Sequence, residues 1–599
     1  MKRRHRLPFG AEIVPGGVRF CLWAPDSGEV DLCLTSGLGE RVKRMQRSAD
    51  GWHELMCDEA HAGSRYRFRI DGGRPVPDPA SRFQPDDVHG PSEVIDPWAF
   101  EWSDGEWRGR PWEEAILYEL HVGTFTRAGT FAGVEERLDY LAGLGVTAIE
   151  LMPVADFPGD RGWGYDGVLP FAPDSRYGRP DDLKRLVQAA HTRNLMIFLD
   201  VVYNHFGPDG SYFHLYAKKF FTDRHHTPWG KAINFDGPGS RQVRDFFIHN
   251  ALYWLKEYHF DGLRLDAVHA ILDDSEPSFL AELARAVRGE VGQDRFVHLI
   301  LENDDNAAHL LAPEGFTAQW NDDVHHALHV LATGESRGYY TDYADAPLER
   351  LGRALTQGFA YQGEPSRHRG GRMRGEPSGH LPPTAFLTFL QNHDQIGNRA
   401  MGERITRIAS DEAVRAVTAI LLLAPSPPLL FMGQEWAAVQ PFPYFCDFDE
   451  PLAGQVRRGR RREFASFPEF QEDEAQARIP DPTAARTYEQ AILNWADIAA
   501  SPHRDWLDFT HELLVLRLRD VVPRLRGARA GRFRLTGGAG LFAAWPMGDG
   551  SQLSVYANLG AEGAPALAAS PGRPIYATHS VRGGMPGWSV AWYLGEPTA

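Results

Sequence analysis

Eight short apolar runs lie between residues 115 and 436, and each is followed by a segment with helical character. A repeated strand-then-helix order is typical of a parallel sheet with helices packed on it, and eight repeats favour a closed barrel over an open doubly wound sheet. We therefore expect an α/β fold built on a (β/α)8 TIM barrel. The runs are AILYELHV (115–122), TAIELMPV (147–154), LMIFLDVVYNH (195–205), GLRLDAV (262–268), FVHLILEND (296–304), TAQWNDD (317–323), AFLTFLQNHD (385–394) and PLLFMGQEW (428–436).

Short alternating segments separated by turn residues flank this region on both sides. Residues 11 to about 100 contain GGVRFCLWAP, EVDLCLT and SRYRFRID, a pattern typical of an antiparallel β-sandwich. After about residue 530 the chain returns to short strands and glycines. Since a domain has ~100 to 200 residues, 599 residues allow about three. We expect an N-terminal immunoglobulin-like β-sandwich at 1–105, the barrel at 106–530 and a small C-terminal β-domain at 531–599.

The charge balance limits the partners of the chain. The formal net charge of −17 argues against nucleic acid or an anionic membrane as the main partner. A local basic run, RRGRRREF at 457–464, is followed closely by the acidic run QEDE at 471–474. We interpret the basic run as a solvated face rather than a nucleic-acid patch. Neutral substrates suit this balance better.

Cysteine usage and the N-terminus indicate a compartment. The four cysteines show no Cys-x-x-Cys spacing, so we expect neither a disulfide framework nor a zinc site. The first residues are basic, but no apolar stretch follows them, and no uninterrupted apolar run of about 18 residues occurs anywhere. We expect a soluble cytoplasmic protein, a monomer or weak dimer, with no membrane partner.

Polar residues gather where the apolar runs end. In a barrel of this kind the active site lies at the carboxyl ends of the strands. A single carboxylate there is often a helix cap or a salt-bridge partner. Several on one rim, beside an arginine and histidines, would be costly to bury for packing alone. They are Asp200, Asn204 and His205 on the third strand, Arg264, Asp266 and His269 on the fourth, Glu302, Asn303 and Asp304 on the fifth, and Asn392, His393 and Asp394 on the seventh.

Two carboxyl groups with different roles are what glycoside hydrolysis requires. One protonates the leaving oxygen, and the other attacks the anomeric carbon or activates water there. This chemistry needs no metal or cofactor, and we expect none. A phosphate-transfer enzyme would carry a glycine-rich cradle with lysine and serine or threonine, and the sequence contains none.

Four segments resemble the signature motifs of the α-amylase family of glycoside hydrolases. They are DVVYNH (200–205), GLRLDAVHA (262–270), ILEND (300–304) and LQNHDQ (390–395), in the family's order and on the expected strands. The resemblance implies retaining chemistry on α-glucans. It assigns Asp266 as the nucleophile, Glu302 as the general acid/base and Asp394 as the carboxylate that stabilises the transition state.

The same resemblance implies substrate-binding residues around the three carboxylates. Arg264 would hold Asp266 ionised and oriented, because a nearby guanidinium favours the charged form. His205 and His393 match the histidines that hydrogen-bond the glucose at the cleavage site, and Tyr165 in GWGYDG matches the ring that stacks on it. We further expect His269, Asn392 and Gln395 to contact substrate.

Further segments resemble one branch of this family, the maltooligosyltrehalose trehalohydrolases. They are DPASRFQPDDVHGPS (78–92), QWNDDVHHALHVLATGE (319–335), LQNHDQIGNRAMGERI (390–405) and FMGQEWAA followed by PFPYF. The sandwich resembles the sugar-binding-type module of branching and debranching enzymes. The implied reaction is hydrolysis of the α-1,4 bond next to the terminal trehalose of maltooligosyltrehalose, so the expected partners are this substrate and related α-glucans.

Three details qualify the resemblance. Branching enzymes carry a glutamate where this chain has Gln395, which counts against that activity. Asp323, His325 and His326 follow the sixth strand, where they either reach the substrate or cap the next helix. Asn204 matches a calcium-binding position of many α-amylases, but no other ligands accompany it, so we expect a structural role and no metal.

Two other hypotheses remain open at this level. An α-1,4-glucan branching or debranching enzyme would share the barrel and the catalytic residues. A catalytically inactive glucan-binding or scaffold protein would have lost one of the three carboxylates, and all three are present.

Overall fold

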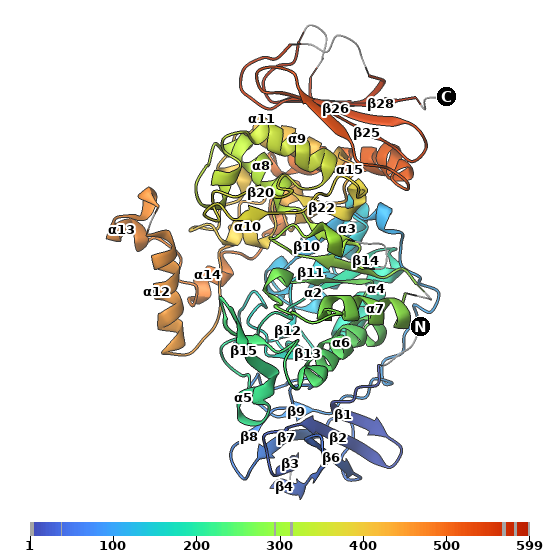
Figure 1. The fold of residues 1–599 in the computed structure, drawn as a ribbon, viewed down its shortest axis with the longest axis vertical. Coiled ribbons are helices and arrows are strands. Elements are labelled where there is room, and N and C mark those ends of the chain that lie inside the picture. The colour runs from blue at the N-terminus through green and yellow to red at the C-terminus, as the bar shows by residue number, and fades with distance from the viewer. Residues whose placement is uncertain are drawn as a thin grey trace.

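The centre of the protein is a closed barrel of eight parallel strands (Figure 1). The computed structural model describes residues 5–36, 39–292, 295–311, 315–465, 467–565, 571–579 and 584–596. Each of the eight apolar runs forms one barrel strand, in chain order around the barrel, which confirms the predicted (β/α)8 fold. The strands are β10 (Leu117–Leu120), β11 (Ala148–Leu151), β14 (Met196–Val201), β17 (Gly262–Leu265), β18 (His298–Leu301), β19 (Ala318–Trp320), β22 (Phe386–Phe389) and β23 (Pro428–Phe431).

The barrel strands are buried on both faces, which explains why they read as continuous apolar runs. Helices with one apolar face cover the outside of the barrel. Serine side chains begin two of them: Ser278 accepts from the amide of Ala281, and Ser410 accepts from that of Ala413. The helices around the barrel are α1 (Val122–Phe125), α2 (Phe131–Glu135), α3 (Leu138–Leu144), α4 (Pro180–Thr192), α5 (Phe213–Tyr216), α6 (Ser240–Glu257), α7 (Phe279–Glu290), α8 (Asp322–Thr333), α9 (Pro347–Gln357), α10 (His393–Gly397), α11 (Asp411–Leu423) and α15 (His503–Leu516).

The N-terminal part is the predicted antiparallel sandwich, at the bottom of Figure 1. One sheet has the order β1-β2-β6-β5, and the other has β4-β3-β7-β8, with β9 also paired to β7. Alternating residues of the central strands are buried, as in β7, where Tyr66, Phe68 and Ile70 face the core. The strands are β1 (Gly10–Val14), β2 (Gly17–Trp23), β3 (Val30–Ser36), β4 (Gly39–Arg44), β5 (Gln46–Arg47), β6 (Trp52–Cys57), β7 (Arg65–Ile70), β8 (Pro75–Val76) and β9 (Ser92–Glu93).

A buried arginine joins the sandwich to the barrel. Arg82, in the proline-rich connection, pairs with Glu12 of β1 at 2.8 Å and with Glu257 at the end of α6 at 3.1 Å. Its Nη1 also donates to the carbonyl oxygen of Ala11 at 2.9 Å. All three charged side chains are at most 3% exposed. Because buried charges must be paired, this cluster fixes the position of the sandwich on α6.

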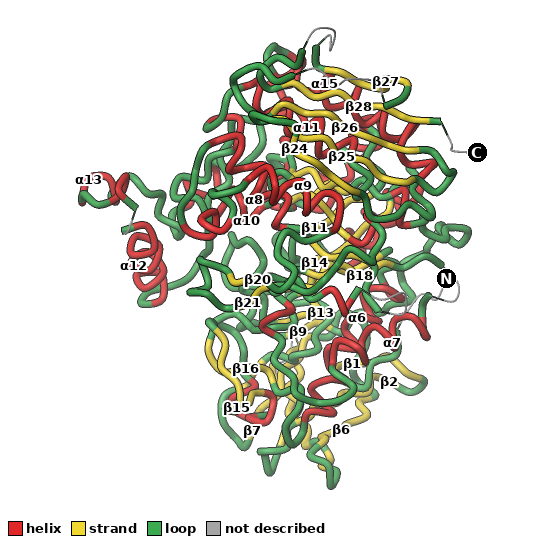
Figure 2. Tube along the Cα trace, turned by 45° about the horizontal axis from the view of Figure 1, so that its top comes forward, coloured by secondary structure: helices red, strands yellow, loops and turns green. Residues whose placement is uncertain are grey.

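The C-terminal part is a five-stranded antiparallel sheet, which Figure 2 shows lying over helices of the barrel. Two tryptophans attach it to them. Trp592 Nε1 donates to the carbonyl oxygen of Ala419 in α11, and Trp545 Nε1 donates to that of Leu355 in α9, both at 3.1 Å. The sheet has the order β24 (Arg532–Leu535), β25 (Gly540–Pro546), β26 (Gln552–Asn558), β28 (Ser589–Gly595), β27 (Arg573–Ala577).

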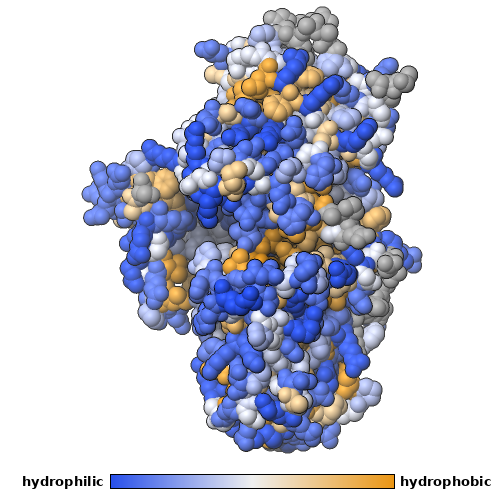
Figure 3. All heavy atoms as spheres, in the orientation of Figure 1, coloured by the Kyte–Doolittle hydropathy of each residue, from blue (hydrophilic) through white to orange (hydrophobic). Residues whose placement is uncertain are grey.

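A helical arm after the last barrel strand projects to the left in Figures 1 and 3. It consists of α12 (Leu452–Phe464), α13 (Asp473–Gln476) and α14 (Ala485–Glu489). The basic run 457–464 lies in α12. Most of its arginines are solvated as expected, but Arg460 is 8% exposed, and its Nη2 donates to the carbonyl oxygens of Gly397 and Arg399 at 2.6 and 2.9 Å. Arg460 is therefore an anchor, which corrects that interpretation at one position.

No helix among the described residues is long and apolar enough to traverse a lipid bilayer.

We expect Arg82→Ala to destabilise the protein by about 3–5 kcal/mol, because it leaves Glu12 and Glu257 buried without their cation. Urea unfolding followed by tryptophan fluorescence and circular dichroism measures the change. Arg44→Ala is the matched control: Arg44 pairs with Glu29 and Asp31 on an exposed face of the sandwich, so its loss should leave the transition midpoint unchanged. Equal midpoints for the two variants would contradict the role of Arg82.

Candidate active site

One buried guanidinium organises the carboxyl ends of the barrel strands. Arg264 on β17 is fully buried, and its Nη1 donates to Asp200 Oδ2 at 2.7 Å and to Asp266 Oδ1 at 2.8 Å. Its Nη2 forms an ion pair with Glu302 Oε2 at 2.7 Å. The guanidinium lies 4.1 Å from the centre of the Trp320 ring, which covers one face of it. Carboxylates from three strands therefore share one fixed cation.

Asp266 is held in its ionised form. Burial alone would raise its pKa, but the charge of Arg264, the neighbouring His205 and a hydrogen bond from Asn204 outweigh burial and lower the pKa below its ordinary value. Asn204 Nδ2 donates to both Asp266 Oδ2 and the Asp266 carbonyl oxygen at 2.8 Å. The carboxylate is thus charged, oriented and 8% exposed, as a nucleophile requires.

Glu302 is shifted in the opposite direction. Burial raises its pKa well above the ordinary value, and the charge of Arg264 offsets this only in part, because Asp266 and Asp394 are also close. Glu302 Oε2 accepts a 2.8 Å hydrogen bond from the amide of Ala267. Ala267 has a φ of +40°, so the residue after Asp266 adopts a strained left-handed conformation, and its N–H points at Glu302. Two neighbouring carboxyl groups thus differ in protonation, which suits an acid and a nucleophile.

Asp394 lies at the start of α10, on the same rim. Its Oδ1 is 3.5 Å from His393 Nε2 and accepts a hydrogen bond from Asn398 Nδ2 at 3.3 Å. Its side chain is 36% exposed, so it faces the open space above the barrel. Its charge contributes to the raised pKa of Glu302, which brings it into the same electrostatic cluster. The structure therefore places the three predicted catalytic carboxylates around one site.

His393 and Tyr165 form one side of the site. His393 Nδ1 is 2.5 Å from Glu119 Oε1 on β10. Burial lowers the pKa of His393, but the charge of Glu119 outweighs it and raises the pKa to about 9. The Tyr165 ring stacks on the His393 ring with their centres 5.0 Å apart, and its hydroxyl donates to Asp200 at 2.6 Å. Gly164, with a φ of +99°, allows this approach, because a Cβ there would lie 2.1 Å from the carbonyl oxygen of Pro153.

His205 contacts the backbone of Tyr165. Its Nε2 is 3.0 Å from the Tyr165 carbonyl oxygen, and its Nδ1 contacts Asn204 Oδ1. Burial lowers the pKa of His205, although the charge of Asp266 opposes it. Its ring stacks on Trp229, which is 50% exposed between β15 (Phe221–Thr227) and β16 (Gly230–Ile233). Sequence reasoning did not single out Trp229.

The other predicted contacts at the ends of the fourth and seventh strands differ in how far the fold already uses them. His269 Nδ1 accepts from the amide of Asp304 at 3.3 Å, so one of its nitrogens is used. Asn392 caps α10, since its Oδ1 accepts from the amide of Gln395 at 2.9 Å, and it is 1% exposed. Gln395 Nε2 donates to Asp322 Oδ1 at 3.3 Å. The fold therefore uses the Asn392 oxygen, whereas its buried Nδ2 has no hydrogen-bond partner among the described residues. His269 and Gln395 are only partly buried and border the site.

The residues predicted after the sixth strand lie deeper than expected. Asp323 is fully buried: it accepts from Asn306 at 3.0 Å and pairs with Arg374 at 3.2 Å. His325 Nδ1 is 2.6 Å from the carbonyl oxygen of Leu390. Protein partners satisfy both side chains, so we propose no substrate contact for them. Asp323 does not cap α8 either, because its Oδ2 accepts from the amides of Ala360 and Tyr361.

Asp322, rather than Asp323 or His325, lies at the rim of the site. It is the first residue of α8, it is partly exposed, and it contacts Gln395. Burial raises the pKa of Asp322 to about 7, with Asp304 and Asp394 adding to the shift. His326 is 7% exposed, and its Nδ1 has no protein partner, while its ring contacts that of Tyr339 at 4.8 Å. His326 therefore remains a candidate contact.

Two buried carboxyl groups below the site were missed. Glu119 on β10 binds His393, and Glu150 on β11, opposite Glu119 in the sheet register, is fully buried. Burial raises the pKa of Glu150 well above its ordinary value, so it is a neutral acid. A charged residue within a short apolar strand could have revealed them: Glu119 in LYEL and Glu150 in AIEL resemble Arg264 in GLRL in this respect.

The residues around Asn204 do not fit the calcium site found at this position in many α-amylases. The Asn204 amide donates to Asp266, and its oxygen contacts His205, so it has no free oxygen for a cation. A separate group, His225, Asp236 and Asp274, has side-chain atoms close enough for a metal. Arg224 is 3.1 Å from Asp236 and 3.6 Å from Asp274, and this cation already neutralises the carboxylates. We assign no metal to either place.

Family models match all three parts of the chain. The α-amylase catalytic domain matches residues 94–251, carbohydrate-binding module 48, described as the isoamylase N-terminal domain, matches 8–99, and a domain of unknown function matches 528–592. A solved structure of a putative α-amylase from Salmonella typhimurium is 43% identical, with a TM-score of 0.94, and the alignment covers 99% of this chain and 100% of that one.

Curated relatives are similar over most of the chain. Malto-oligosyltrehalose trehalohydrolase of Saccharolobus solfataricus is 40% identical over 85% of this chain and 87% of that protein. The protein of the same name from Deinococcus radiodurans is 42% identical over 86% of this chain and 84% of that protein. With this similarity over most of its length, the chain belongs to the malto-oligosyltrehalose trehalohydrolase family, within the α-amylase family of glycoside hydrolases.

Proposed function

We propose that the protein hydrolyses the α-1,4-glucosidic bond next to the terminal trehalose of maltooligosyltrehalose and releases trehalose with a retaining mechanism. The observation that carries this proposal is the cluster on Arg264, which holds Asp266 and Glu302 side by side and in which the pKa of Asp266 is lowered and that of Glu302 is raised. The trehalohydrolase relatives supply the choice of substrate.

The geometry supports a double displacement. Ionised Asp266 attacks the anomeric carbon, while Glu302 gives its proton to the glycosidic oxygen, so that trehalose leaves as a neutral alcohol. A glycosyl ester on Asp266 remains. Glu302, now ionised, takes a proton from a water molecule, which attacks the anomeric carbon and frees Asp266. Arg264 pairs with both groups and balances their charge throughout.

Asp394, Tyr165 and His393 position the sugar in this scheme. The Tyr165 ring is fixed by stacking on His393 and by its bond to Asp200, so it presents a flat apolar surface to the sugar. The raised pKa of His393 keeps it a donor near neutral pH. Asp394 is free on its exposed side to accept hydrogen bonds from sugar hydroxyls.

We also propose that the protein works in the cytoplasm as a monomer or weak dimer. All four cysteines are buried free thiols, which is consistent with a reducing compartment. The exposed large apolar side chains, such as Met56, Phe296 and Leu535, come from separate parts of the fold rather than from one dominant patch.

Product analysis tests the activity. Given maltopentaosyl trehalose, the purified protein should release trehalose, with much less cleavage of maltohexaose. Asp266→Ala should abolish turnover, and Glu302→Gln should lower it by about 10²–10⁴-fold, the usual contribution of a general acid. Asp245→Asn, an exposed carboxylate on the outer helix α6, is the control and should retain activity. Equal cleavage of both substrates would refute the trehalohydrolase assignment, and altered branching of a long glucan would favour a branching enzyme.

The pH dependence follows from the two shifts. Asp266 must be ionised and its pKa is lowered, so activity should persist below the pH at which an ordinary aspartate is protonated. Glu302 must be protonated and its pKa is raised, so activity should extend well above the ordinary glutamate range. In Asn204→Ala, Asp266 loses a bond to its charged form, so the acidic limb of kcat/KM should move to higher pH. An acidic limb that stays in place would show that Asn204 does not act through Asp266.

Asp322 and Asp323 are adjacent in sequence and should behave differently. Asp322→Asn changes a rim residue, so we expect a higher KM with an unchanged melting temperature. Asp323→Asn breaks a buried cluster with Arg374, so we expect a loss of about 3–5 kcal/mol in the free energy of unfolding. Thermal unfolding and steady-state kinetics on both variants check this. If Asp323→Asn raised KM without affecting stability, the placement of this helix would be wrong.

A further inference from the structure

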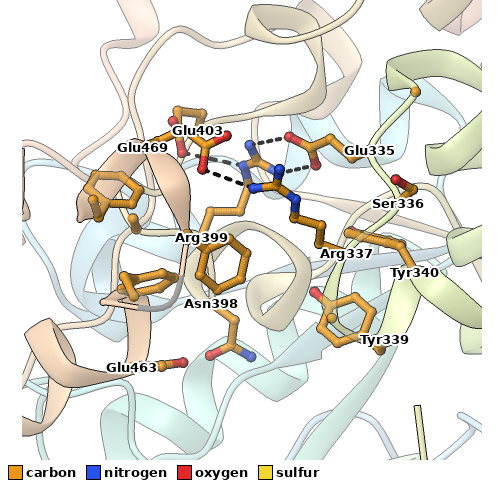
Figure 4. Close-up of a pocket in the computed structure, with 16 residues that line it drawn as sticks. Glu335, Ser336, Arg337, Tyr339, Tyr340, Asn398, Arg399, Glu403, Glu463 and Glu469 are labelled. Carbon is orange, nitrogen blue, oxygen red and sulfur yellow. Dashed lines mark hydrogen bonds and ion pairs between the residues drawn. The ribbon is translucent and has the colours of Figure 1, made fainter. Parts of the chain in front are cut away.

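A pocket of about 780 Å³ lies beside the catalytic rim, between the barrel and the helical arm (Figure 4). Three segments far apart in sequence line it: 334–340 after α8, 398–403 after α10, and 463–470 at the end of α12. Its volume is in the range of about 300–1,000 Å³ that small-molecule sites occupy. The mechanism above uses none of these segments.

The lining combines flat rings with planar polar groups. Tyr339 and Tyr340 lie on the barrel side, and Phe464, Phe467 and Phe470 on the arm side. Carboxylate, amide and guanidinium groups lie among them. Rings pack on the apolar faces of sugars, while such polar groups bond to hydroxyls, so this mixture suits a neutral carbohydrate. The polar groups are Glu335, Arg337, Asn398, Arg399, Glu403 and Glu463.

The barrel-side wall is rigid. Arg399 makes two bonds to Glu335, at 2.7 and 2.9 Å, and a third to Glu403 at 3.3 Å, as the dashed lines of Figure 4 show. Glu335 also contacts His329 Nε2 at 2.7 Å. Burial lowers the pKa of Arg399 less than these carboxylates raise it, so the pair stays charged. The polar groups are therefore fixed before a ligand binds.

The arm-side wall is attached to the same segment. Arg460 bonds the backbone of Gly397 and Arg399, and the Phe464 ring packs with Ala400 in a small apolar cluster. Arg337 lies 3.6 Å from Glu469, which connects the two walls. The arm is thus held at a set distance from the barrel, with the pocket between them.

One hydrogen bond links the pocket to the catalytic site. Asn398, which lines it, donates to Asp394 at 3.3 Å. Tyr339 also lines it and contacts His326, next to the rim residue Asp322. Burial raises the pKa of Tyr339 to about 12, so the hydroxyl is a neutral donor. The pocket therefore borders the place where a sugar would bind at the carboxylates.

We propose that this pocket is a carbohydrate subsite, which binds α-linked glucose units of the substrate beyond the unit at the catalytic carboxylates. The inference rests on the proposed function for the identity of the substrate. Both ends of that substrate carry such units, the glucan chain and the trehalose, and the experiment distinguishes them.

Tyr339→Ala and Phe467→Ala remove one ring from each wall. An aromatic contact is worth about 0.5–1.5 kcal/mol, so each should raise KM for maltopentaosyl trehalose about 2- to 12-fold with kcat largely kept. Tyr339→Phe retains the ring and should stay closer to wild type. Phe296→Ala is the matched control, since Phe296 is 49% exposed before β18, at the opposite end of the barrel. Melting temperatures confirm that each variant is folded.

Two readouts identify the bound end. If the pocket holds trehalose, both alanine variants should weaken inhibition by added trehalose. If it holds the glucan, they should instead flatten the dependence of KM on chain length between maltosyl and maltopentaosyl trehalose. Kinetics identical to Phe296→Ala in both readouts would overturn the subsite. If the wild-type protein released no trehalose, the proposed function would be refuted, but the subsite would not. Calorimetry of maltoheptaose binding to Glu302→Gln, with and without Tyr339→Ala, would still test the pocket.

Discussion

The buried guanidinium of Arg264 is the interaction on which the site depends. A fully buried cation is costly unless carboxylates surround it, and here Asp200, Asp266 and Glu302 do so within 2.8 Å. Each acid comes from a different strand, so the barrel must close in register for the arginine to be satisfied. Closing the barrel in register therefore also brings the reactive groups together around Arg264.

The same arginine does not make its partners alike. Asp266 also has Asn204 and His205 as neighbours and stays ionised, whereas Glu302 has two further carboxylates nearby and stays protonated. The difference comes from the other neighbours rather than from the distance to Arg264, which is nearly equal. Local electrostatics thus shift the pKa values of two like groups in opposite directions, as the proposed nucleophile and acid require. Glu119 acts similarly on His393 from the strand below.

The barrel, both β-domains and the three carboxylates were predictable because each depends on a pattern along the chain: strand length, alternation, and polar residues at strand ends. Asp322 was not, since it and Asp323 are neighbours at a helix start, and adjacent helical positions differ by about 100° in direction. The sequence pattern does not fix the first residue of the helix, so it cannot tell which of the two aspartates faces the site. The pocket could not be predicted for another reason: three separate segments line it, and only the fold brings Tyr339 and Phe467 to the same space.

The buried contact of Arg82 with Glu12 and Glu257 has a consequence for how such proteins diversify. A sandwich that contacted the barrel only through apolar surface could be exchanged between related proteins as an independent domain. Here an exchange would transfer Glu12 and Arg82 onto a new barrel and leave Glu257 behind, creating uncompensated buried charge on one side or both. The sandwich and the barrel are therefore constrained to change together, and their history in this lineage should be that of a single inherited unit.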